Sequence, residues 1–152
     1  MSGTLRCAVT WRLQTVLPDL VEYLERLPEP RLRTVAEAVV IAALRAAGLS
    51  EVRVERALEA LRARAYGDSE QRASVEALAD ELDEAAWAVQ ERMDAGEPNE
   101  AEYSAAFRRA RAAASLWFAL DSDPLAAALE ASYEAQAAAD EATVRREIAA
   151  AS

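Results

Sequence analysis

The chain has 152 residues and a formal net charge of −10, and this length suffices for one domain with its own core, which we expect over residues 1–152. It contains no His, and all 17 basic residues are Arg, which excludes Ser-His-Asp and Cys-His nucleophile systems, imidazole metal ligands and lysine Schiff bases. A single cysteine, Cys7, excludes an internal disulfide and favours a reducing compartment.

Apolar residues recur at three- and four-residue intervals along the chain, a spacing that is typical of amphipathic helices. Gly and Pro residues divide this pattern into segments, and no run alternates as a strand does. The predicted helices cover Leu5–Arg26, Arg31–Ala47, Glu51–Tyr66, Gln71–Ala95, Asn99–Leu120, Asp123–Ala138 and a short segment from Asp140. We therefore predict an all-α fold, a single-domain helical bundle of six or seven helices.

Several ends of these helices have local signals. Pro18 is expected to kink or restart the first helical region, because proline cannot continue a helix normally. Gly48 is predicted to end the second helix, and Ser50 to cap the third. The second helix, Arg31–Ala47, is apolar nearly all round, so we expect it at the centre of the bundle.

Residues 121–132 begin with two Asp residues two positions apart, as a calcium-binding loop does. The central Gly of such a loop is missing, however, and its twelfth position holds Ser132 instead of Glu. A helix start accounts for the same residues, with Asp123 as the N-cap and Pro124 at the first helical position. We therefore predict a helix start here, and neither a metal ion nor a cofactor is expected.

The negative charge is concentrated between Asp68 and Glu102, where 12 acidic residues and two Arg give a net charge of −10. Trp87 lies in this segment, beside the apolar stripe of its helix and among carboxylates. A Trp among acidic residues has the composition of an interaction hot spot for a basic partner. The predicted partner-binding residues are Trp87, Asp80, Asp83, Glu84, Glu91 and Asp94. Alternatively, Trp87 packs sideways on another helix and the carboxylates form a solvated face.

Aromatic residues of the last third of the chain share helical faces. These residues are Tyr103, Phe107, Trp117, Phe118 and Tyr133. Such spacing is more typical of a packed core than of a ligand site, and no polar residue stands out as an anchor for a ligand. A lipophilic pocket lined by these five side chains is the alternative interpretation.

Three further features carry weaker signals for function. Residues 43–61 have the spacing of a helix-turn-helix, but any helical hairpin ended by Gly shares it, and acidic side chains lie on the second helix. Glu37 is expected to be the one partly buried acid, paired with a nearby Arg. Cys7 has only Arg6 beside it, which does not make a reactive thiol. No catalytic residue is assigned.

These observations favour a non-enzymatic, acidic helical protein that binds a basic protein partner, as an immunity protein or an inhibitor that imitates nucleic-acid charge does. A small-molecule-binding protein is the alternative, and a DNA-binding protein is a less favoured one because the negative charge repels nucleic acid. The chain shows no signal peptide and no apolar run long enough to cross a bilayer, so we expect a cytoplasmic protein without membrane contact. We expect a monomer or a weak homodimer that pairs through the less charged N-terminal half near Trp11.

Overall fold

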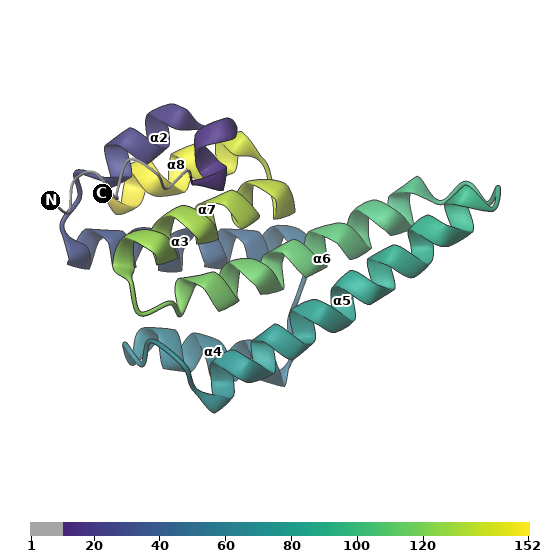
Figure 1. The fold of residues 1–152 in the computed structure, drawn as a ribbon, viewed down its shortest axis with the longest axis horizontal. Coiled ribbons are helices and arrows are strands. Elements are labelled where there is room, and N and C mark those ends of the chain that lie inside the picture. Colours follow the sequence, from purple (N-terminus) through teal and green to yellow (C-terminus); the bar gives the residue numbers. More distant parts are fainter. Residues whose placement is uncertain (1–10) are drawn as a thin grey trace, which may run out of the picture.

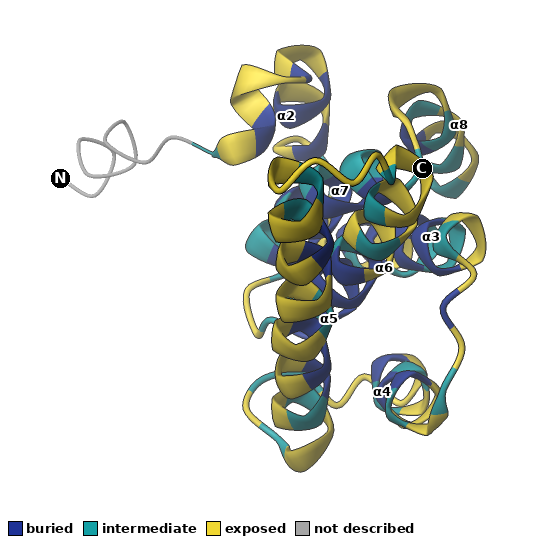
Figure 2. Ribbon diagram, turned by 90° about the vertical axis from the view of Figure 1, so that its right-hand side faces the viewer, coloured by how far each residue is buried: buried dark blue, intermediate teal, exposed yellow. Residues whose placement is uncertain are grey.

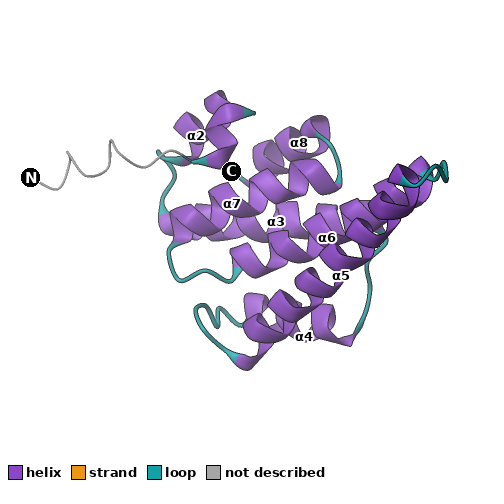
Figure 3. Cartoon of the chain, turned by 45° about the vertical axis from the view of Figure 1, so that its right-hand side comes forward, coloured by secondary structure: helices purple, strands orange, loops and turns teal. Residues whose placement is uncertain are grey.

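The computed structural model describes residues 11–152, and these residues form helices joined by short loops, with no β-strand among them (Figures 1 and 3). The predicted all-α bundle is therefore confirmed. Cys7 and the start of the first predicted helix lie outside the described residues. The elements are a 3₁₀ helix, η1 (Arg12–Thr15), and the α-helices α2 (Pro18–Leu24), α3 (Glu29–Ala47), α4 (Val52–Arg62), α5 (Glu70–Asp94), α6 (Glu100–Ala119), α7 (Pro124–Ala138) and α8 (Glu141–Ala151).

The first predicted helical region is divided at Pro18. This residue stands at the first position of α2, after the short η1 has ended. Proline lacks the amide hydrogen that a continuing helix needs, but its fixed φ angle suits a first helical position. Of the two outcomes predicted for Pro18, the structure shows a restart.

Helix α3 lies at the centre of the bundle, as its apolar sequence predicts. It packs against α6, α7 and α8, and Figure 2 shows the buried, dark blue stretches gathered where these helices meet. Its buried side chains are Leu32, Val35, Ala36, Val39, Val40, Ala43 and Leu44. Gly48 ends the helix with a left-handed φ of 64°, which confirms the predicted stop.

The predicted limits of the third helix are wrong at both ends. Ser50 does not cap it, because α4 starts at Val52 and Glu51 is the N-cap residue, whose side chain makes no capping bond to the helix backbone. The helix ends at Arg62 because Arg64 adopts a left-handed φ of 59°. The chain then turns toward α5 instead of continuing to Tyr66.

Helices α5 and α6 form an antiparallel hairpin whose outer half projects beyond the other helices (Figures 1 and 3). With 25 residues, α5 is about 37 Å long. We call residues 83–109 the projecting hairpin. Its only buried side chains are those of Ala86 and Val89, on α5. This arm therefore consists of two helices that have only each other to pack against.

The start of α7 confirms the predicted cap. The backbone N–H of Leu125 donates to the Asp123 carboxylate at 3.1 Å, and Pro124 occupies the first turn. Within residues 11–152, no three side chains of the metal-binding types are clustered where they could hold an ion. Among the helices of this range, none combines the length and apolar character that crossing a membrane requires.

Candidate functional site

The structure leaves Trp87 exposed on the projecting hairpin. Trp87 is 65% accessible to solvent, so it does not pack sideways on another helix, whereas the predicted acids around it do lie on an exposed face. A surface groove of about 470 Å³ runs beside it. The groove is lined by Asp83, Glu84, Ala86, Trp87, Tyr103 and Phe107. One predicted hot spot and two of the predicted pocket aromatics thus share a single groove.

The pairing of α5 with α6 explains why these residues meet. Asp83 faces Arg111 at 2.6 Å, and Arg92 faces Glu102 at 2.7 Å nearer the tip. This antiparallel register places Trp87 opposite the segment of α6 that carries Phe107. Tyr103 lies one helical turn away from Phe107, and the two rings stack with centroids 6.1 Å apart.

Polar contacts hold the groove in shape. The indole Nε1 of Trp87 donates to the Glu91 carboxylate at 2.9 Å, which restrains the ring on the helix surface. Arg111 holds Asp83 and lies 5.8 Å from the centre of the Phe107 ring. Glu84, on the groove wall, makes no ion pair with any residue in the described range. The groove therefore combines an aromatic surface with carboxylates, of which Glu84 is unpaired.

The other predicted acids lie around this groove. Asp80 lines a second groove of about 330 Å³, which shares Asp83 with the first and continues along α5 toward the body of the bundle. Asp94 stands at the end of α5, where its carboxylate accepts a hydrogen bond from Gln90 at 2.9 Å. The predicted acids therefore extend along α5 from the bundle to the tip of the hairpin.

The five predicted pocket aromatics do not line one cavity. Trp117 and Phe118 line the second groove, where their rings meet edge to face at 4.8 Å. Tyr133 lies under the Arg12 guanidinium, 4.4 Å from its ring centre. The alternative of one lipophilic pocket is therefore not supported. The aromatic residues at the start of α6 lie on the projecting hairpin, and those at its end lie in the bundle, so they line different grooves. Tyr103 and Phe107 lie on the projecting part, where only α5 covers them.

A buried carboxylate at the base of the hairpin was missed by the sequence analysis. The side chain of Glu134 on α7 is 1% exposed and accepts from Arg111 at 2.8 Å and from Arg12 at 3.0 Å. Glu37 is partly buried, with its side chain 37% exposed, and pairs with Arg62 at 3.4 Å as expected, but it is not the one acid with a buried side chain. Ala131, Ala135 and Ala138 around Glu134 form the only sequence signal, since they place it on a buried face.

The buried carboxylate also affects Arg111. Desolvation by burial lowers the pKa of this guanidinium, but the charges of Glu134 and Asp83 outweigh that effect, so its pKa is raised overall. Arg111 therefore stays cationic and joins α5, α6 and α7 at the point where the hairpin leaves the bundle.

The remaining predicted sites have structural roles. In the predicted helix-turn-helix segment, α4 packs mainly on α5 and contacts α3, the helix that precedes it in the motif, far less. Its Arg53 is bound by Glu51 and Glu81 at 2.6 and 2.8 Å. Trp11, through which the homodimer was expected to pair, is partly buried against the core. The oligomeric state stays a prediction.

The described chain is thus an all-α helical bundle that carries a projecting two-helix arm with an acidic, aromatic groove. Comparison with models of protein families, with curated proteins and with solved structures found no match. The groove suits the binding of an apolar surface that also bears positive charge.

Proposed function

We propose that this protein is a non-enzymatic binding protein of the cytoplasm that holds a basic protein partner on the projecting hairpin, in the manner of an immunity protein or an inhibitor. The observation that carries the proposal is the 65% exposure of Trp87 in a groove with Tyr103 and Phe107, beside carboxylates. Three large aromatic side chains on a thin arm do not serve the core of the bundle. They supply a surface that is stabilised when a partner covers it.

The charge of the arm supports a basic partner. The segment Asp68–Glu102 carries a net charge of −10, and the unpaired Glu84 stands on the wall of the groove. Such a field accelerates the approach of positive surfaces and repels nucleic acid and further copies of the arm. The binding energy itself comes mainly from burial of Trp87, because exposed ion pairs contribute little.

The shape of the site favours a helix as the element that the partner inserts. The two grooves share Asp83 and follow α5 from Trp117 to Trp87. An amphipathic helix of about three turns spans roughly 17 Å, which matches the distance along α5 from Glu76 to Trp87. Apolar side chains of that helix face the aromatic groups, and its Arg or Lys residues face the acids of α5.

A defined peptide tests this proposal. We would titrate the protein with a fluorescently labelled Leu/Arg amphipathic helical peptide and with a Leu/Glu peptide of the same apolar pattern. We expect the basic peptide to bind with an affinity that falls as salt is raised, and the acidic peptide not to bind. Equal binding of both peptides, or binding of neither, would overturn the proposed site.

Matched variants locate the interaction. Trp87→Ala is expected to weaken binding about tenfold or more, as loss of a hot-spot residue does. Glu84→Arg reverses a charge on the groove wall and is preferable to a change at Asp83, which also anchors Arg111. Tyr23→Ala is the control, because Tyr23 is likewise an exposed aromatic residue but lies on α2. A Tyr23→Ala effect as large as that of Trp87→Ala would contradict the assignment.

A further inference from the structure

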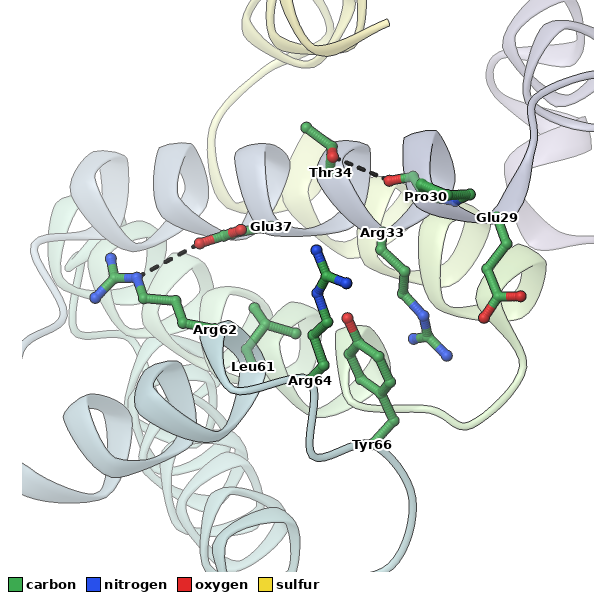
Figure 4. Close-up of a pocket in the computed structure, with 9 residues that line it drawn as sticks. All are labelled: Glu29, Pro30, Arg33, Thr34, Glu37, Leu61, Arg62, Arg64 and Tyr66. Carbon is green, nitrogen blue, oxygen red and sulfur yellow. Dashed lines mark hydrogen bonds and ion pairs between the residues drawn. The ribbon is translucent and has the colours of Figure 1, made fainter.

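A separate cavity of about 360 Å³ lies between α3 and the end of α4, away from the projecting hairpin (Figure 4). Its lining includes three Arg residues, Arg33, Arg62 and Arg64. Tyr66 and the carboxylates of Glu29 and Glu37 also line it. In a chain whose net charge is −10, this lining carries more positive than negative groups.

The backbone of Arg64, which lines this cavity, has an unusual conformation. Arg64 has a φ of 59° and follows the end of α4, where the N–H of Ala65 donates to the carbonyl of Ala60 at 2.9 Å. The same bond pattern ends α3 and α5, and there the left-handed position is held by Gly48 and Gly96. A residue with a Cβ atom is strained in this conformation, and glycine is the usual occupant. An Arg at this position therefore has a local energetic cost.

The guanidinium of Arg64 is also the one in this cavity without a partner. Figure 4 shows it reaching toward α3, between Glu37 and Tyr66. Within residues 11–152 it makes no hydrogen bond and no ion pair. Arg62 by contrast is paired with Glu37 at 3.4 Å. Five N–H donors of Arg64 thus remain available to a molecule in the cavity.

Arg33 also lines the cavity, and hydrogen bonds hold its side chain in place. Its guanidinium donates to the carbonyls of Asp121 and Ser122 at 2.7 and 2.9 Å, and it lies 3.5 Å from the centre of the Tyr66 ring. These contacts fix the Tyr66 side chain, whose hydroxyl points toward the Arg64 side chain (Figure 4). Tyr66 and Arg64 line the same cavity, and a hydroxyl and a guanidinium are both donors to an oxyanion.

We propose that this cavity binds a small molecule that carries an oxyanion group, a carboxylate or a phosphate, held by Arg64 and Tyr66. The planar fork of an Arg side chain matches two oxygens of either group. The carboxylates of the lining do not prevent this, because Glu37 is neutralised by Arg62, and Glu29 stands at the opposite end of the cavity. The volume is that of a site for a small molecule and not for a macromolecule.

Calorimetric titration at low ionic strength tests the proposal, with inorganic phosphate in one arm and succinate in the other. We expect saturable binding of at least one of these probes to the unmodified protein, and the arm that saturates identifies which group the site takes. Arg64→Gln should weaken this binding about tenfold or more, since it removes a charged hydrogen-bond donor. Tyr66→Phe should weaken it to a smaller extent.

Two further variants separate binding from folding. Arg64→Gly removes the guanidinium and also the backbone strain, so it should fold at least as well as the unmodified protein and still lose binding. Arg26→Gln, in the exposed turn after α2, should bind as the unmodified protein does. Absence of saturable binding in both arms, or equal binding by the Arg64→Gln and unmodified proteins, would overturn the proposal.

Discussion

Nη1 of Arg111 lies 2.8 Å from Oε2 of Glu134, whose side chain is 1% exposed. The two residues come from α6 and α7, and the same guanidinium reaches Asp83 on α5 at 2.6 Å. Arg12 of η1 contacts the other oxygen of Glu134 at 3.0 Å. Four elements thus meet at one buried carboxylate, directly where the projecting hairpin leaves the bundle.

Glu134→Gln should lower the free energy of unfolding by about 2–3 kcal/mol, because it leaves two guanidinium groups facing a neutral side chain. The expected loss of stability is smaller than for a fully buried ion pair, since Arg12 and Arg111 keep some contact with solvent. Glu130→Gln, which removes an ion pair of Arg12 nearer the surface, should cost under about 1 kcal/mol. Urea unfolding of the two variants measures the difference, and equal losses would contradict the central role of Glu134.

Trp87→Ala should change the free energy of unfolding by no more than about 0.5 kcal/mol, because the side chain is exposed. Trp117→Ala should lower it by about 2–4 kcal/mol, since Trp117 packs on the core, against Phe118, and under the Arg72 guanidinium. Denaturant unfolding checks both values. A large loss of stability in Trp87→Ala would show that Trp87 supports the fold and is not reserved for a partner.

The stability of the protein should fall as the pH is lowered below about 4. The pKa of Asp19 is lowered by its hydrogen bonds from Arg145, that of Glu81 by Arg53, and that of Asp140 by the backbone N–H of Thr143. A carboxyl with a lowered folded-state pKa stabilises the fold above its ordinary pKa. This contribution is lost progressively as the pH falls through the folded-state pKa.

Melting temperatures measured between pH 7 and pH 3 test this dependence. Asp19→Asn should flatten the acid limb of the curve, because it removes one of the groups that take up protons on unfolding. Glu25→Gln is the control, since Glu25 lies on the surface and makes no ion pair with another described residue. An unchanged acid limb in Asp19→Asn, or the same flattening in Glu25→Gln, would contradict the prediction.

Arg64→Gly should raise the free energy of unfolding by about 0.5–1 kcal/mol, because glycine adopts the left-handed φ of 59° without steric strain. Arg64→Ala keeps a Cβ atom at this position and should give no such gain. Comparing the two variants by denaturant unfolding separates backbone strain from loss of the side chain. If Arg64→Ala stabilised the protein as much as Arg64→Gly, the strain would not lie in the backbone.

The sequence by itself was sufficient to predict the all-α bundle and the central place of α3. Hydrophobic periodicity, and helix-end signals such as Gly48 and Asp123, depend on residues within one or two helical turns. They therefore act in the same way whatever the rest of the chain packs against the segment. The same local geometry placed Trp87 beside the apolar stripe of its helix. It also misplaced Ser50 as a cap, because the exact first residue of a helix depends on weak competing bonds.

Only the tertiary structure decided which of these side chains lie together and which face solvent. Trp87 is exposed because no third helix covers the projecting hairpin, and its groove exists because the pairing of α5 with α6 brings Phe107 opposite. Glu134 is buried because Arg12, 122 positions earlier, and Arg111 converge on it. Burial of a charge depends on partners that are distant in sequence and close in space, and helical periodicity carries no information about them.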